Sequence, residues 1–197
     1  MTLVLRAGAV TLRPFTPSDF ALVWAEETRD RGAFESPWAV DDERARERVS
    51  ARIEYSGSWR QERVLDLAVE VDGQVVGDVQ ARRDLDYAPP GIFDLGIGLF
   101  GDRRGQGIGS SAIALITAFL FDEERANRVQ LSTDVDNLAM RRAAEKAGFT
   151  LEGVMRGFWN VPDATTRDYA LYARTRADHA AAPTEERTEI DVAENGG

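Results

Sequence analysis

The sequence contains no cysteine and a single histidine, and these two shortages exclude much chemistry. Without cysteine there is no disulfide, no thiolate nucleophile and no cysteine-based metal site. The one histidine, His179, lies beside an alanine-rich, acidic end of the chain, which does not suit a Ser-His-Asp triad or a zinc site. Acid–base chemistry is therefore expected from carboxylates, tyrosines or ordered water, and we expect no metal.

Long apolar runs and an excess of basic residues are also missing. No stretch approaches the roughly 18 apolar residues of a membrane helix, and the start of the chain lacks the apolar core of a signal peptide. We therefore expect a cytoplasmic protein that does not act at a membrane. The formal net charge of −10 disfavours binding to nucleic acid phosphates. Such acidity favours cationic substrates only weakly and more often serves solubility.

What is present suffices for one domain with a short tail. The chain has 197 residues, of which 43% are hydrophobic, enough for a substantial core. We predict that the domain covers residues 1–176. From 177 to 197 the chain is alanine-rich, then acidic, and has no aromatic residue, a composition typical of disorder.

The hydrophobic periodicity predicts a mixed α/β domain. A hairpin over 64–80 turns at Asp72-Gly73, and an alternating strand follows at 91–100. Around these, we expect a strand at 10–15, helices at 17–29 and 41–56, a helix from about 109 to 124, a strand at 128–135, a helix at 138–147 after Asn137, and strands at 153–161 and 167–176.

Residues 96–101 spell GxGxxG, a dinucleotide-binding pattern. That pattern works only where its glycines follow a strand and open a helix. Here Gly96 and Gly98 lie inside the strand, so we set the dinucleotide interpretation aside. Glycines in a strand instead predict a bulge that leaves N–H groups free for an extended ligand.

Residues 104–109 spell a different pattern, RxxGxG, between the strand and the following helix. Three glycines at alternate positions leave the backbone bare, so successive N–H groups can point at a diphosphate. The helix dipole adds attraction, and Arg103 and Arg104 supply positive charge. The alternative interpretation is a generic tight turn.

Three segments together resemble the GNAT acetyltransferase superfamily, most closely its RimJ/RimL-type branch. RRGQGIG at 103–109 is similar to the branch's phosphate-binding core, and NLAMRRAAEKAGF at 137–149 to its asparagine-to-EKxGF segment. EGVMR at 152–156, followed by Asp168 and Tyr172, is similar to its ending. The resemblance implies the GNAT fold, a central, mostly antiparallel, twisted sheet flanked by helices.

The resemblance covers roughly residues 8–176 and implies acetyl-CoA as the acetyl donor. The Ile97 N–H would bind the acetyl carbonyl, where attack by an amine builds negative charge. The Leu99 N–H would pair with the pantetheine, and Asn137 would lie near the departing sulfur while capping its helix. The implied cofactor-binding residues are Leu99, Arg103, Arg104, Gly105, Gln106, Gly107, Ile108, Gly109, Ser110, Asn137 and Arg142.

The catalytic base and acid are both open. Asp94 stands where the branch has a glutamate and is our first choice for the base, acting through a water. Asp134 is the second, and a structural or solvated carboxylate is the alternative for each. A thiol pKa near 8.5 means that water can suffice as the acid.

Two departures from the family pattern concern this acid. Ala144 replaces a tyrosine that many members use, and Met140 replaces the serine of RimL-type enzymes. An alternative donor to water is Tyr169 or Tyr172.

Aromatic and acidic side chains in the early loop and the late hairpin suit a cationic amine. The candidates are Glu35, Trp38, Trp159 and Asp168, with core packing as the alternative for the tryptophans. Enzymes similar to RimJ and RimL acetylate protein N-termini, and close relatives acetylate aminoglycosides, polyamines or other small amines. The sequence does not choose between these acceptors. Because dimers are common in the branch, the resemblance also allows a homodimer.

We therefore predict acetyl transfer from acetyl-CoA to a primary amine by direct attack in a ternary complex. The lack of cysteine excludes a thioester intermediate on the enzyme. A non-catalytic, acetyl-CoA-binding regulatory module is the second reading, and a nicotinamide-dependent oxidoreductase is the third.

Overall fold

The computed structural model describes residues 2–30, 42–56, 63–83, 86–160, 165–182 and 191–195. Its elements follow the predicted order, with additions at both ends of the chain. They are β1 (Thr2–Ala7), β2 (Val10–Arg13), η1 (Pro17–Asp19), α1 (Phe20–Asp30), α2 (Asp42–Tyr55), β3 (Val64–Val71), β4 (Gln74–Arg82), β5 (Ile92–Leu99), η3 (Gly101–Arg103), α3 (Ile108–Asp122), β6 (Arg128–Asp134), α4 (Leu138–Lys146), β7 (Thr150–Asn160), β8 (Thr166–Thr175), α5 (Arg176–Ala181) and β9 (Asp191–Asn195).

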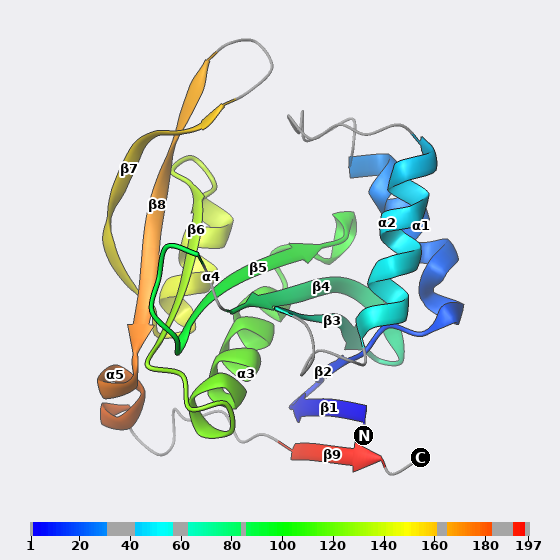
Figure 1. Ribbon diagram of the computed structural model, residues 1–197, viewed down its shortest axis with the longest axis horizontal. Helices are drawn as coiled ribbons and strands as arrows, with labels where there is room; N and C mark the ends of the chain where they lie inside the picture. Colours follow the sequence, from blue (N-terminus) through cyan, green and yellow to red (C-terminus); the bar gives the residue numbers. More distant parts are fainter. Residues whose placement is uncertain are drawn as a thin grey trace.

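One mixed sheet organises the molecule (Figure 1). Among the described residues, nine strands lie in the order β7-β8-β6-β5-β4-β3-β2-β1-β9. β5 and β6 run parallel, whereas the other neighbouring pairs run antiparallel. Parallel neighbours need a crossover connection, and α3 provides it. The predicted mixed, mostly antiparallel sheet flanked by helices is therefore confirmed.

The two faces of the sheet carry different layers. α3 lies against one face, and its buried side chains, such as Ile113 and Phe119, form the main core with the inward side chains of the strands. α1 and α2 lie at the opposite face of β3 and β4 (Figure 1), where Val23 and Val49 pack with Ala68. The β7–β8 hairpin stands on the other side of β5 and β6 from these two helices (Figure 1).

The N-terminus forms a hairpin rather than the single strand expected at 10–15. β1 and β2 pair in antiparallel register, and Gly8 lies between them with a φ of +56°. Leu3, Val4 and Leu5 are consecutive and all buried, so β1 is covered on both faces. A strand covered on both faces shows no apolar–polar alternation, which explains why periodicity misses it.

The end of the chain also differs from expectation, because parts of the segment 177–197 have regular structure. α5 begins with a capping box in which Thr175 and Asp178 bind each other's backbone N–H groups, and the buried ring of His179 stacks on Phe121 at 4.8 Å. β9 pairs antiparallel with β1. The capping-box spacing was present in the sequence, whereas the pairing of β9 depends on a strand far away along the chain.

Candidate active site

The last residues of β5, 96–99, are paired with β4 on one side and have no described strand partner on the other, and we call this unpaired side the open edge of β5. The Phe100 N–H donates to the Val76 carbonyl at 2.9 Å, toward β4. Alternation along the strand turns the N–H groups of Ile97 and Leu99 the opposite way, toward β6. β6, however, pairs with β5 only over residues 92–95. These two N–H groups therefore point into the space where the two strands diverge.

The glycines inside β5 make room for polar side chains of β4. The β4–β5 register is continuous, so the predicted bulge is absent from this pair. A Cβ on Gly98 would lie 3.0 Å from Asp78 Oδ1, and a Cβ on Gly96 would lie 3.4 Å from Arg82 Nη1. The open edge therefore results from the divergence of β6 and not from a bulge at the glycines. The glycines instead leave room for the side chains of Asp78 and Arg82.

The turn after β5 brings a bare backbone to the start of α3. Gly105 and Gly107 have φ values of +77° and +83°, in the left-handed region that favours glycine. Gly107 is the N-cap of α3 and supplies no side-chain cap, which leaves N–H groups of the first helical turn available to an anion. Arg104 Nε donates to the Leu99 carbonyl at 3.1 Å and holds this turn against the open edge. We call Ile97, Leu99 and residues 103–109 the β5–α3 cradle.

Three cations lie at or beside the cradle. Arg104 is exposed, and Arg103 donates to Gln74 Oε1 at 2.8 Å. The third cation, Lys146 in the last turn of α4, is missing from our predicted residues. A Cβ on Gly107 would lie 3.9 Å from its Nζ. Lys146 belongs to the EKxGF segment, so that motif could have indicated it.

Asp94 lies on the face of β5 turned away from α3, because its neighbours Phe93 and Leu95 are buried in the main core. Its Oδ2 accepts hydrogen bonds from Arg82 Nη2 at 2.8 Å and from Arg82 Nε at 3.3 Å. Tyr87 lies nearby and is largely exposed; partial desolvation, followed by the negative charge of Asp94, raises the pKa of its phenol. Tyr87 is thus a protonated group beside the predicted base that no sequence motif indicates.

The sequence model of the family described as "Acetyltransferase (GNAT) domain" matches residues 9–150, which include the whole cradle. The chain belongs to the GNAT acetyltransferase family. The superfamily predicted from the three sequence segments is therefore confirmed.

Solved structures of GNAT proteins share the fold. RimJ of Mycobacterium smegmatis in complex with CoA-disulfide is 24% identical, with a TM-score of 0.73 and 96% of each chain covered. RimL, a ribosomal L7/L12 alpha-N-protein acetyltransferase in complex with coenzyme A, is 18% identical, with a TM-score of 0.74 and 87% of this chain and 97% of that chain covered. The microcin C7 self-immunity acetyltransferase MccE, in complex with acetyl-CoA and AMP, is 18% identical, with a TM-score of 0.70 and 85% and 92% covered. A comparison with curated protein sequences finds no match.

Asp134 of this GNAT domain has partners for both of its oxygens. Oδ1 accepts the Asp136 N–H at 2.8 Å, and Oδ2 accepts from Arg167 at 3.0 Å. The Asp136 N–H and the Arg167 guanidinium hold the pKa of Asp134 below its usual value, although burial acts in the opposite direction. These contacts favour the structural interpretation of Asp134 and leave Asp94 as the first candidate for the base.

The two candidate tyrosines differ in their surroundings. The buried Tyr172 hydroxyl donates to Glu145 Oε1 at 3.0 Å and accepts from Arg141 Nε at 3.1 Å. Tyr169 stacks against Trp159, with ring centroids 5.9 Å apart, and burial and the carboxylate at the end of β6 raise its pKa. Tyr169 is therefore the better placed of the two to meet a ligand at the hairpin.

The predicted acceptor residues do not form one described group. Trp159 is half-buried on β7, beside Tyr169. Asp168 Oδ1 accepts the Gly157 N–H at 2.7 Å, where the β7–β8 register shifts, so this carboxylate holds the hairpin in shape. Glu35 and Trp38 lie outside the described residues.

Two predicted cofactor residues lie on or next to α4. Asn137 caps the helix, because its Oδ1 accepts the Met140 N–H at 3.1 Å. The capping interpretation of Asn137 is thus confirmed, and its role toward a cofactor stays a prediction. Arg142 is exposed on the same helix.

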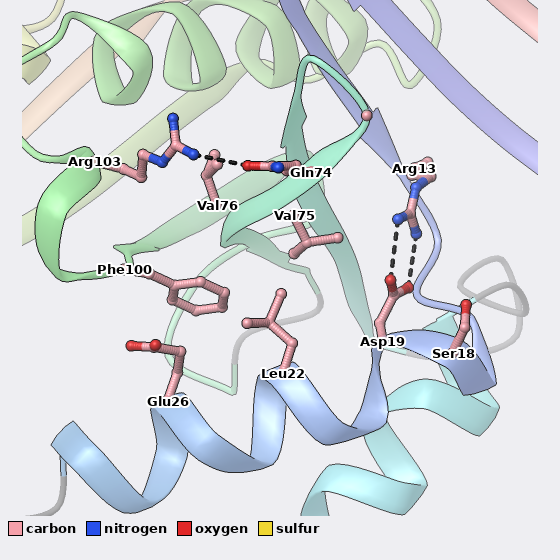
Figure 2. A pocket seen from close by; sticks show the side chains of 11 residues that line it. Arg13, Ser18, Asp19, Leu22, Glu26, Gln74, Val75, Val76, Phe100 and Arg103 are labelled. Carbon is pink, nitrogen blue, oxygen red and sulfur yellow. Dashed lines mark hydrogen bonds and ion pairs between the residues drawn. The ribbon is translucent and has the colours of Figure 1, made fainter.

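A separate cavity of about 400 Å³ lies between α1 and the β3–β4 turn (Figure 2). Leu22 and Glu26 face it from α1, and Phe100 and Arg103 face it from the segment after β5 (Figure 2). Its lining includes neither Asp94 nor the open edge of β5. The cavity therefore borders the cradle at Arg103 but is not the place where the predicted chemistry would occur.

Within the ranges that the structure describes, no three carboxylate, imidazole or thiol side chains come together as a metal site requires. None of the helices in those ranges combines the length and the apolarity needed to cross a bilayer.

Proposed function

We propose that the chain is an N-acetyltransferase that moves the acetyl group of acetyl-CoA to a primary amine. The observation that carries this proposal is the β5–α3 cradle, in which two N–H groups on an open strand edge lead to a bare turn and a helix N-terminus. Similar structures hold CoA-disulfide, coenzyme A or acetyl-CoA, which supports the choice of ligand. The likeness to RimJ and RimL supports the RimJ/RimL-type branch.

The cradle has donors and charge that fit an extended thioester with a diphosphate. The N–H groups from Arg104 to the first turn of α3 would hold the diphosphate, with Arg103 and Lys146 adding positive charge. The Leu99 N–H would pair with an amide of the pantetheine arm. The Ile97 N–H would face the acetyl carbonyl oxygen, where a fixed donor is worth about 2.7–4 kcal/mol as charge develops.

The chemistry that acetyl-CoA supplies is an acyl group activated by a thiolate leaving group. The acceptor nitrogen forms a bond to the acetyl carbon while the carbon–sulfur bond breaks and the sulfur keeps the electron pair. Asp94 accepts, through a water, the proton that the acceptor ammonium must lose before it can attack. The nitrogen releases its second proton to water as the amide forms, and water, or a tyrosine such as Tyr169 or Tyr87, gives a proton to the sulfur.

The acceptor is a protein N-terminus or a small amine, and both remain in the proposal. Asp94 on β5 supplies a carboxylate and the Trp159–Tyr169 pair on the hairpin supplies aromatic rings, a combination that suits a cationic group.

A non-catalytic, acetyl-CoA-binding module is the second candidate. One observation favours it: Ala144, at the position of the tyrosine found in many family members, is fully buried in the main core. Such a module would bind acetyl-CoA and release no thiol.

The test is thiol release from acetyl-CoA on a panel of amines. The panel contains a peptide with a free N-terminus, the same peptide with a blocked N-terminus, a polyamine and an aminoglycoside. We expect release with at least one free amine, and a turnover about 100-fold lower in Asp94→Asn, since general bases contribute about 10²–10⁴-fold. The matched control is Asp86→Asn, because Asp86 is an exposed carboxylate that also pairs with an arginine, Arg63. Acetyl-CoA binding without release from any amine would support the regulatory module instead.

A further inference from the structure

Arg82 and Asp94 form an ion pair on the face of the sheet opposite α3. They stand directly opposite each other in the β4–β5 register. Two guanidinium nitrogens of Arg82 donate to one oxygen of Asp94, Oδ2, at 2.8 and 3.3 Å. Among the described residues, no hydrogen bond reaches the other oxygen, Oδ1. The pair therefore fixes the orientation of the carboxylate and leaves one oxygen for a water or an amine.

Arg82 is itself held by a chain of polar contacts that ends on α2. Its Nη1 donates to Gln80 Oε1 at 3.2 Å, and Gln80 Nε2 donates to Asp66 Oδ2 at 3.2 Å. Asp66 accepts two hydrogen bonds from Arg52 of α2, at 2.5 and 2.9 Å. Arg52 also pairs with Asp78 at 2.7 Å. A guanidinium anchored on both sides in this way has little freedom to rotate.

The backbone of β5 places this guanidinium beside the cradle. A Cβ on Gly96 would lie 3.4 Å from Arg82 Nη1 and 3.5 Å from Nη2, so the guanidinium lies over Gly96. The next residue is Ile97, whose N–H points into the space between β5 and β6. Arg82 thus lies one residue away from the proposed donor to the acetyl oxygen.

Stability alone gives a weak reason for such a pair. The Arg82 side chain is 39% exposed and that of Asp94 is 21% exposed. Partly exposed pairs contribute about 0–1 kcal/mol, whereas this one also engages a second β4 side chain, Gln80. We propose that Arg82 is a positioning residue, which holds Asp94 so that Oδ1 faces the acceptor while Arg82 itself is anchored through Gln80. This inference rests on the proposed function, in which Asp94 is the base.

The experiment compares wild type with Arg82→Ala, Arg82→Lys, Asp94→Asn and the Arg82→Ala/Asp94→Asn double variant. We expect Arg82→Ala to lower kcat about ten- to hundred-fold while the KM for acetyl-CoA changes less than about two-fold, because misplacement of a catalytic group costs rate rather than cofactor binding. Added guanidinium ion should restore part of the rate of Arg82→Ala. The double variant should be no slower than Asp94→Asn. Arg82→Lys should recover only part of kcat, since an ammonium cannot reproduce the two-point contact.

The control is Arg128→Gln, which removes another arginine–carboxylate pair of the same sheet, with Glu152. It should lose stability but keep kcat, and equal losses of kcat in Arg128→Gln and Arg82→Ala would overturn the inference. A wild-type kcat in Arg82→Ala would also overturn it. So would a double variant whose fold-loss of kcat equals the product of the two single fold-losses. Full activity in Asp94→Asn would instead refute the assignment of the base.

A measurement without substrate covers the case in which no tested amine is an acceptor. The same single and double variants are unfolded in urea. The shifts in midpoint should be non-additive if Arg82 holds Asp94. Additive shifts would overturn the inference without any measurement of activity.

Discussion

Gly109 gives a sharp test of the cradle, because alanine there would alter the ligand site without straining the fold. Gly109 lies in the first turn of α3, and an added Cβ would meet Leu99 Cδ1 at 3.5 Å, an ordinary contact. Alanine in place of glycine within a helix gains about 0.5–1 kcal/mol. We therefore expect Gly109→Ala to unfold at an equal or slightly higher temperature than wild type when no ligand is added.

The same methyl group would lie in the first turn of α3, whose N–H groups are proposed to hold the diphosphate. We expect CoA to bind at least tenfold more weakly, a loss of about 1.4 kcal/mol. Wild type with CoA at about 100 times its Kd should gain about 2.7 kcal/mol. For a domain of this size, 1 kcal/mol corresponds to about 2–4 °C, so CoA should raise the Tm of wild type by about 5–11 °C. The rise for Gly109→Ala should be smaller by about 3–6 °C.

The assay is thermal unfolding with and without CoA at one concentration. Ser111→Ala is the matched control, because Ser111 is exposed in the same helix, outside the cradle. It should keep the full CoA-induced rise. If Gly109→Ala also keeps the full rise while remaining folded, the diphosphate does not lie on the first turn of α3 and the cradle is misassigned.

Three further predictions concern Asp19, Tyr172 and Gly98. Burial raises the pKa of Asp19, but hydrogen bonds from Arg13 and from the backbone outweigh it and hold this pKa below its usual value. Asp19→Asn should therefore cost about 1–3 kcal/mol in urea unfolding at pH 7, and the difference from wild type should shrink as the pH falls below about 4. Tyr172→Phe should cost about 0.5–1.5 kcal/mol and leave thiol release unchanged, whereas a hundred-fold slower release would make Tyr172 the acid. Gly98→Ala should cost about 1–3 kcal/mol by thermal unfolding, because the new Cβ would lie 3.0 Å from Asp78 Oδ1, and an unchanged Tm would contradict this account of the glycine.

Local patterns predicted most of the fold. The turn at Asp72-Gly73 and the alternation around it define β3 and β4, and a change from a period of two to a helical period marks the junction between β5 and α3. The RxxGxG pattern could be placed because it needs only that junction. Each of these features depends on residues close together in the sequence.

Features that depend on distant partners could not be predicted in the same way. β9 and the pair of Arg82 with Asp94 exist only because of strand order and register. Asp168 is a further example. Its sequence context predicted a contact with the acceptor, whereas in the structure its carboxylate accepts the Gly157 N–H where the hairpin register shifts. A motif can indicate which residue types occur at a site, whereas the partner of each side chain follows from tertiary structure.

The position of the cradle follows from the topology of the sheet. β5 and β6 are the parallel neighbours in a sheet whose other described pairs are antiparallel, so the chain must cross over between them through α3. A crossover helix begins near the carboxyl end of the strand that precedes it, which brings the N-terminus of α3 to the end of β5. Because β6 leaves β5 after residue 95, the N–H groups of Ile97 and Leu99 lie along the approach to that helix end. One topological feature therefore brings together the donors for the acyl group and the donors for the diphosphate, and a substitution that restored β5–β6 pairing beyond Leu95 would abolish both ligand binding and turnover.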